Sequence, residues 1–166
     1  PVDMGIAGAP VPGAVDCRVA PGTADFTHGP AMTRAEALQA IAAGIALVQA
    51  QKRSGVQLLA TGEMGIGNTT TSSAVASVLL RRPPAALTGR GAGLSDEGLQ
   101  RKIAAIERGI AVNSPDAADP LGVLAALGGF DIAGLCGVFL GGALESIPIV
   151  VDGFISGVAA LCAVRL

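Results

Sequence analysis

The chain has few of the residues that usually mark nucleic-acid-binding or disulfide-rich proteins. Its 166 residues include no tryptophan, no tyrosine, one histidine and three cysteines, and only 14% of them are charged. The formal net charge is -2, and the sequence contains no basic tract. This charge pattern gives no electrostatic reason to attract nucleic acid or an anionic membrane surface. We therefore expect no nucleic acid and no membrane as partner, and a small molecule instead.

Long apolar runs are also missing, although 51% of the residues are hydrophobic. The apolar stretch from Ile132 to Leu144 is bounded by Asp131 and Glu145, and it is shorter than the roughly 20 residues that a membrane-spanning helix needs. The three cysteines show no metal-ligand spacing, and their odd number argues against a disulfide framework. These absences favour a cytoplasmic protein with no metal site.

What remains is a pattern of helices that alternate with short strands. A capping box at Thr33-Arg-Ala-Glu36 predicts a helix over 34–53, and further helices are expected over 69–80, from 96 to about 112, and from 120 onward. The run "VQLLA" is typical of a strand buried on both faces of a parallel sheet, and "IPIVV" is typical of a β-branched buried strand. We expect the segment 7–32, which is rich in proline and glycine, to be a loop.

This alternation predicts an α/β fold, with a parallel, doubly wound, Rossmann-like sheet and flanking helices. The run "VDMGI" at the start has the character of a strand tail, and the last strand and its helix lead into no further strand. Because a parallel strand and its crossover helix normally feed another strand, we expect the sheet to be incomplete at both ends.

The stretch "TGEMGIGNTTTSSA", residues 61–74, has the parts of an anion site. It joins a strand to a helix through a glycine turn, so a ligand can approach the backbone at Gly65 and Gly67 and meet the helix N-terminus at Asn68 and Thr69. The spacing is neither that of a Walker A loop nor the dinucleotide G-x-G-x-x-G, so ATP and NAD are poorly supported. The alternative is a tight connection whose glycines serve only packing.

Three side chains near this turn are further candidates. A carboxylate at Glu63 would repel a phosphate, so it should face a hydroxyl or ring nitrogen of the ligand, unless it is a solvated loop residue. Met64 either walls an aromatic ligand or fills the core. Asp152 follows the last strand, where ligand-contacting carboxylates occur, although Asp-Gly is also an ordinary turn.

A second glycine-rich loop, "GRGAG", offers the remaining candidates. It could bring Gly91 and the guanidinium of Arg90 to the same crevice, because ligands of open α/β sheets bind outside the carboxyl ends of the strands. Lys102, on the helix that follows, could supply a point charge for a phosphate. The alternative for Lys102 is a position on a solvated helix face.

Five motifs, in this order along the chain, carry a family resemblance: "GTADFTHGPAMT", "GEMGIGNTTTSSA", "GRGAGLSDEGLQRK", "DPLGVLAALGGFDIAGLCG" and "IPIVVDGF". Together they resemble nicotinate-nucleotide:dimethylbenzimidazole phosphoribosyltransferase. The resemblance implies transfer of phosphoribose from nicotinate mononucleotide to 5,6-dimethylbenzimidazole, which yields α-ribazole 5'-phosphate and nicotinate during assembly of the lower ligand of cobalamin. It also implies a homodimer that needs no cofactor.

The resemblance assigns the nucleotide contacts to residues of the two glycine loops and the helix after the second: Gly65, Gly67, Asn68, Thr69, Gly91 and Lys102. It gives Glu63 a supporting catalytic role and places the main general-base glutamate and much of the benzimidazole pocket outside these 166 residues. We therefore expect 1–166 to be most of the large domain, without the small domain, and inactive alone. The alternatives are a non-catalytic phosphoribosyl-binding domain and, more weakly, a generic nucleotide-binding domain.

Overall fold

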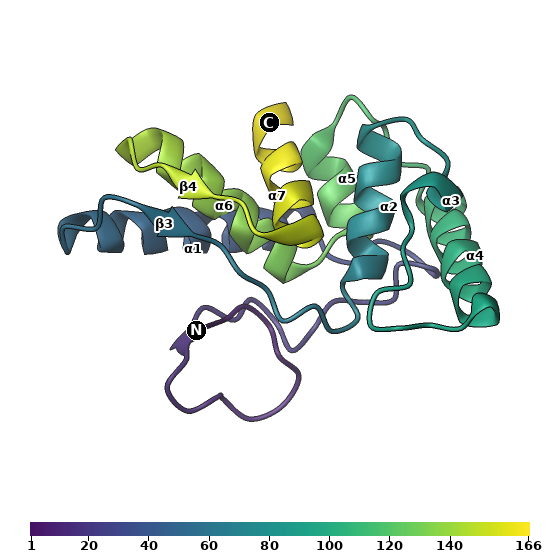
Figure 1. Cartoon of the computed structure of the whole chain (residues 1–166), viewed down its shortest axis with the longest axis horizontal. Helices are drawn as coiled ribbons and strands as arrows, with labels where there is room; N and C mark the ends of the chain where they lie inside the picture. Colours follow the sequence, from purple (N-terminus) through teal and green to yellow (C-terminus); the bar gives the residue numbers. More distant parts are fainter.

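The computed structural model describes residues 1–166 and shows an α/β chain with long helices and very short strands (Figure 1). In chain order the elements are β1 (Val2–Asp3), β2 (Val15–Asp16), α1 (Arg34–Arg53), β3 (Leu59–Ala60), α2 (Thr69–Leu79), α3 (Pro84–Leu87), α4 (Asp96–Asn113), α5 (Pro120–Leu127), α6 (Phe130–Glu145), β4 (Ile149–Val150) and α7 (Gly153–Arg165).

The strands pair in parallel, as the alternating pattern predicts, but they form two separate two-stranded sheets. β1 pairs with β2, and β3 pairs with β4. β2 lies inside the segment 7–32 that was expected to be only a loop, so that expectation is wrong at Val15 and Asp16. The two residues of β2 are exposed and lie among prolines and glycines, so they show no alternation of apolar and polar residues that would predict a strand. The strand is evident only from its pairing with β1.

The expectations that β3 is buried on both faces and that β4 is a buried strand are also wrong. Leu58 is 59% exposed, and Val150 is 51% exposed. Each strand has a single partner, and the cover comes from one side, where the side chain of Ile149 lies against Gly142 of α6. An apolar run predicts that a strand is buried. It does not show whether this chain packs against one face of the strand or against both.

The predicted helix starts are confirmed by their caps. At α1, the Thr33 N–H donates to Glu36 Oε2 over 2.7 Å, and the Glu36 N–H donates to Thr33 Oγ1 over 3.2 Å, which completes the capping box. Ser95 caps α4 and Asp119 caps α5 in the same way through their side-chain oxygens. Beyond the end of α1, Gly55 has a φ of +84°, which lets the chain close with two bonds back to the last turn.

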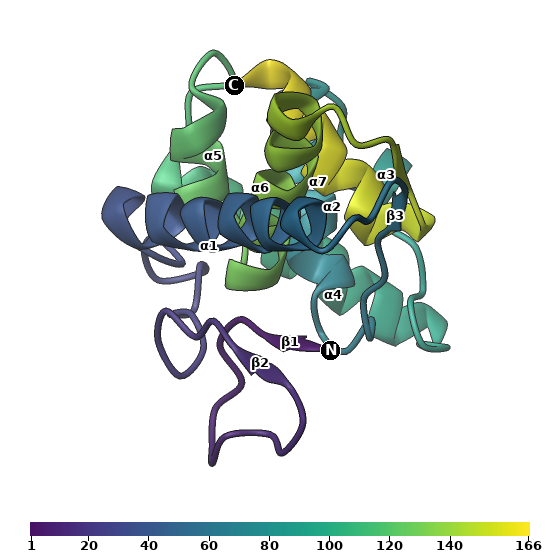
Figure 2. The same cartoon turned by 90° about the vertical axis from the view of Figure 1, so that its left-hand side faces the viewer.

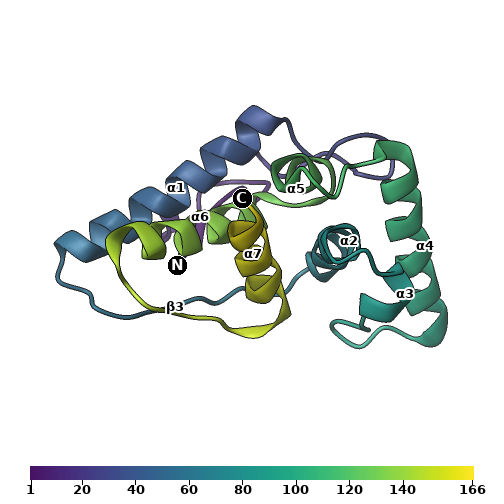
Figure 3. The same cartoon turned by 90° about the horizontal axis from the view of Figure 1, so that it is seen from above.

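α1 and α6 form the tightest contact in the fold, and the middle of α1 packs against α6 where the two helices cross (Figures 2 and 3). Glycines make this possible. A Cβ on Gly44 of α1 would overlap the carbonyl oxygen of Gly134, and a Cβ on Gly137 of α6 would overlap the carbonyl oxygen of Ile41. The two backbones therefore touch directly, and no side chain separates them.

The other helices form a second group around α2. In Figure 3, α7 lies between α6 and α2, and α3, α4 and α5 surround α2 on its other sides. This arrangement turns the N-termini of α2 and α7 toward the carboxyl ends of β3 and β4, which precede them in the chain. None of the helices is both long and apolar enough to cross a membrane.

Candidate functional site

The carboxyl ends of β3 and β4 lie side by side and bring two predicted site segments together. The hydroxyl of Thr61 donates to the carbonyl oxygen of Val150 over 3.1 Å, and the N–H of Asp152 donates to Thr61 Oγ1 over 3.4 Å. Asp152 is exposed, and its side chain makes no capping bond to α7. Its carboxylate is thus free at the sheet edge where parallel α/β folds place their ligands.

The glycine turn between β3 and α2 is bare on its open side. Gly65 and Gly67 have φ angles of +78° and +79°, a backbone region that side chains disfavour. No atom lies within 4 Å of the position that a Cβ would occupy on Gly62, Gly65 or Gly67. A turn whose glycines served close packing would have neighbours at those positions, so these glycines leave open space above the backbone.

The side chains of this turn point into solvent. Met64 is 83% exposed, so the alternative that it fills the core is wrong. The carboxylate of Glu63 is also exposed, and it accepts a hydrogen bond from the N–H of Gly65 within its own turn. The turn therefore presents an apolar group and a carboxylate at the same opening.

Lys102 is the most informative residue of the site, because its ammonium is buried without a carboxylate partner. The residue is only 8% exposed, and Nζ donates to Thr69 Oγ1 over 2.7 Å and to the carbonyl oxygen of Gly89 over 3.0 Å. Burial lowers the pKa of this amine. The alternative of a solvated helix position is wrong, and a cation held against the start of α2 is well placed to meet an anion.

The second glycine loop reaches the same place. Gly91, with φ of +58°, lies where a Cβ would be 3.0 Å from Thr69 Oγ1 and 3.6 Å from Lys102 Nζ. The structure does not bring Arg90 into this group. Its guanidinium pairs with Asp96 and donates to the carbonyl oxygen of Leu94 over 2.8 Å, so its charge is used within its own loop and at the start of α4.

The N-terminus of α2 has free backbone donors. No backbone carbonyl accepts from the N–H of Thr69 or Thr71. Asn68 occupies the N-cap position, yet its side chain makes no capping bond. Instead, Asn68 Nδ2 donates to Asp131 Oδ2 over 2.6 Å. First-turn N–H groups without acceptors, together with the helix dipole, form an anion site.

Asp131 is a site residue that the sequence pattern alone does not identify. It stands in the first turn of α6, and burial, assisted by the negative charge of Glu63, raises its pKa, while the hydrogen bond from Asn68 opposes that rise. The only signal in the sequence is an acidic residue directly after "GGF", which also fits an ordinary first-turn aspartate.

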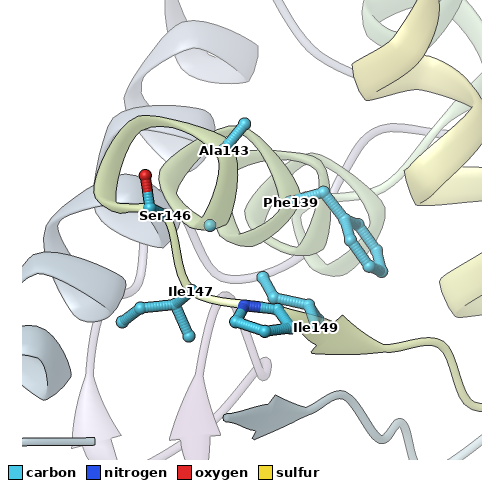
Figure 4. Close-up of a pocket in the computed structure, with 7 residues that line it drawn as sticks. Phe139, Ala143, Ser146, Ile147 and Ile149 are labelled. Atoms are coloured by element: carbon cyan, nitrogen blue, oxygen red, sulfur yellow. The ribbon is translucent and has the colours of Figure 1, made fainter. Parts of the chain in front are cut away.

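A hollow of about 440 Å³ at the C-terminal end of α6 carries no such chemistry. Figure 4 shows it lined by the side chains of Phe139, Ala143 and Ile149, with Ser146 as its only hydroxyl. It contains no ionisable group that could bind a charged ligand or transfer a proton. The cluster of polar groups around α2 is therefore the candidate functional site.

Comparison with known proteins agrees with this assignment of class. A family model described as phosphoribosyltransferase matches residues 1–166. The nicotinate-nucleotide–dimethylbenzimidazole phosphoribosyltransferase of Acetivibrio thermocellus is 56% identical over 93% of this chain and 44% of its own length. The protein of the same name from Roseiflexus castenholzii is 54% identical over 99% of this chain and 47% of its own length.

The fold is shared as well. A crystal structure of CobT from Thermus thermophilus superposes with a TM-score of 0.92 at 41% identity, covering 99% of this chain and 50% of that one. The chain thus spans about half the length of the relatives it matches.

Proposed function

This chain belongs to the nicotinate-nucleotide–dimethylbenzimidazole phosphoribosyltransferase family, and on that basis we propose that it binds the phosphoribosyl group of nicotinate mononucleotide. We propose that a polypeptide of the relatives' full length, of which these residues span about half and which is called the full-length polypeptide below, transfers that group to 5,6-dimethylbenzimidazole and gives α-ribazole 5'-phosphate and nicotinate. The reaction belongs to the assembly of the cobalamin lower ligand.

The observation that carries this proposal is the buried ammonium of Lys102 beside the open start of α2. A lysine taken out of solvent is stable as a cation only if an anion or several acceptors replace the lost water. Here two neutral oxygens do so, and the nearby N–H groups of Thr69 and Thr71 have no backbone acceptor. A phosphate placed there gains a charge-assisted bond from Lys102 and the two backbone donors.

The turns that follow β3 and β4 carry negative charge, which suits the rest of the ligand. The carboxylates of Glu63 and Asp152 lie on the turns that follow β3 and β4. Carboxylates accept hydrogen bonds from ribose hydroxyls, and they favour the positive charge of a pyridinium ring and of a ribosyl centre that loses its leaving group. Phosphate at Lys102 and ribose toward Glu63 orient the nucleotide in one direction.

The chemical step has a simple balance. One nitrogen of dimethylbenzimidazole attacks ribose C1', the bond from C1' to the nicotinate nitrogen breaks, and the other benzimidazole nitrogen loses a proton to a general base. We propose that Glu63 supports this step and that the general base lies outside these residues. Met64, exposed on the glycine turn, walls the aromatic part of the ligand.

Calorimetry with nicotinate mononucleotide tests the binding half of the proposal. We expect the wild-type protein to bind and the Gly65→Val variant to bind at least about tenfold more weakly, because a β-branched residue is strained at φ of +78° and its side chain enters the open space above the turn. Gly55→Val is the control, since Gly55 also has positive φ and open surroundings but follows the C-terminal end of α1. Equal affinity in wild type and Gly65→Val would remove the turn from the site.

Product formation separates the enzyme from its rival, a non-catalytic phosphoribosyl-binding domain. The full-length polypeptide should form α-ribazole 5'-phosphate, and residues 1–166 alone should bind nucleotide but turn over at least about 100-fold more slowly, because loss of a general base typically costs that much. Binding without turnover by the full-length polypeptide would favour the rival.

We further propose that the protein acts in the cytoplasm as a homodimer, as its family resemblance implies. Sedimentation equilibrium of the full-length polypeptide measures the oligomeric state directly. A monomer at micromolar concentration would reject the dimer without affecting the assignment of the nucleotide site.

A further inference from the structure

The hydrogen bond between Asn68 and Asp131 joins the starts of two helices that are far apart in the sequence. Asn68 precedes α2, Asp131 stands in the first turn of α6, and the two residues are separated by 63 positions in the chain. The orientation of the amide is fixed by chemistry, because only its NH2 group can donate to a carboxylate oxygen. Asn68 Oδ1 therefore points away from Asp131.

An asparagine at an N-cap normally caps the helix with its side chain. Its side-chain oxygen accepts from the second or third N–H of the helix, while its own backbone is extended. Here Asn68 has φ of -84° and ψ of -5°, makes no capping bond, and keeps Oδ1 buried without any partner. The N–H of Thr71, the third residue of the helix and a usual partner of such a cap, has no backbone acceptor.

A buried acceptor without a donor is unfavourable, so another contact must hold the Asn68 side chain in this orientation. Asp131 provides that contact, at the positive end of α6 where a carboxylate is stabilised. The cap and a bound phosphate need the same first-turn donors, so they compete. A helix start that capped itself would be closed to the ligand.

We propose that Asp131 is a positioning residue that holds Asn68 away from the start of α2 and so keeps the first-turn N–H groups free for the nucleotide phosphate. This inference rests on the proposed function, and it gives Asn68 a role beyond ligand contact. Asp131 itself need not touch the ligand.

A purely structural tie between α2 and α6 would behave differently. Breaking such a tie lowers stability and ligand affinity together. Breaking the proposed restraint frees Asn68 to turn its backbone extended and cap α2, which adds a favourable bond to the folded protein while it removes donors from the ligand. Affinity and stability then change independently, and this distinguishes the two roles.

The first test removes Asp131 from the full-length polypeptide. Asp131→Ala should bind nicotinate mononucleotide about tenfold more weakly, as expected for competition with a good cap, while its melting temperature stays within about 2 °C of wild type. Asp131→Asn should keep most of the affinity, because its side-chain oxygen can still accept from Asn68. Asp131→Ala/Asn68→Ala, which has no side chain able to cap, should bind at least about threefold more tightly than Asp131→Ala alone.

A matched pair of variants repeats the test with Asp131 intact. Asn68→Ser and Asn68→Ala both lose the bond to Asp131, but serine caps a helix and alanine does not. We expect the serine variant to melt at a higher temperature than the alanine variant and to bind nicotinate mononucleotide several-fold more weakly. Equal affinities of this pair, or parallel losses of affinity and melting temperature in Asp131→Ala, would overturn the inference.

A failure of the proposed function has a separate signature. If the wild-type protein binds neither nicotinate mononucleotide nor inorganic phosphate, the phosphate site itself is wrong, and the inference falls with it. If the wild type binds, Lys102→Met does not, and Asp131→Ala binds like the wild type, the site stands and only the role of Asp131 is rejected.

Discussion

At the scale of single residues, the site depends on one lysine whose burial has a cost. The ammonium of Lys102 donates only to a hydroxyl and a carbonyl oxygen, and no carboxylate balances its charge. A buried, unpaired charge lowers the free energy of unfolding, so Lys102 is better explained by a role in binding an anionic ligand than by a role in stabilising the fold.

Replacement of Lys102 by methionine should therefore separate stability from binding. We expect Lys102→Met to lose about 10- to 100-fold in affinity for nicotinate mononucleotide, as is typical of a hydrogen bond to a charged group, without a loss of thermal stability. Calorimetry and thermal melts measure the two quantities. The same substitution at the exposed Lys52, in the last turn of α1, is the control and should leave the affinity unchanged.

The pH dependence has a definite sign. Burial places the pKa of folded Lys102 below its ordinary value of 10.5, so the unfolded chain holds the proton to higher pH. Stability of the wild type relative to Lys102→Met should therefore rise as pH increases from the lowered pKa toward 10.5. Nucleotide affinity should fall over the same range, as the cation is lost. A wild-type affinity that has not fallen by pH 10.5 would contradict the role of the ammonium.

The sequence predicts which residues belong to the site better than it predicts their burial and their hydrogen-bond partners. Gly91 and Lys102 meet at Thr69, as the sequence predicts for the two glycine loops, because carboxyl ends of parallel strands meet at one edge. The sequence does not reveal that Lys102 is buried or that Asp131 reaches Asn68. Both facts depend on how loops and helices fold onto one another across long stretches of chain, and no local pattern encodes such a contact.

At the scale of elements, caps fix the helices and glycines fix their packing. Helix starts follow from the sequence because Thr33, Ser95 and Asp119 act on their own neighbours. The contact between α1 and α6 does not follow from the sequence. A glycine within a helix lowers the helix propensity of that segment, but it does not show which other helix packs against it. Direct contact of the two backbones makes this pair sensitive to a single methyl group.

Gly137→Ala should therefore destabilise the protein. Its Cβ would overlap the carbonyl oxygen of Ile41, so α1 and α6 would have to separate, at a cost of about 1–3 kcal/mol in the free energy of unfolding. Gly157→Ala is the matched control on α7, where no atom lies within 4 Å of the new Cβ. There the substitution should stabilise by about 0.5–1 kcal/mol. Urea unfolding measures both, and similar effects at the two sites would contradict the packing argument.

At the scale of the whole molecule, the sheet built by β3 and β4 has an uncovered apolar face. Leu58 and Val150 share this face by register and are 59% and 51% exposed, and both strands have an unpaired edge. The α/β class follows from the alternation of elements in the sequence. The extent of the sheet does not, because it depends on which other strands are available to pair.

We expect residues 1–166, when isolated, to self-associate through this face, since exposed edges and apolar patches promote pairing between chains. Val150→Lys should shift the sedimentation coefficient toward that of a monomer. Leu38→Lys, at an equally exposed leucine on α1, should not. Indistinguishable sedimentation of the wild type and Val150→Lys would place any association elsewhere.

The long separation between paired elements also bears on how the protein is made. Thr61 and its partner Val150 are 89 positions apart, and α1 likewise precedes α6 by a comparable length of chain. At synthesis rates of about 5–20 residues per second, the ribosome releases α1 and β3 roughly 5–20 s before their partners exist. During that interval the glycine surface of α1 has nothing to pack against, and a nascent chain in that state is a natural client for a chaperone.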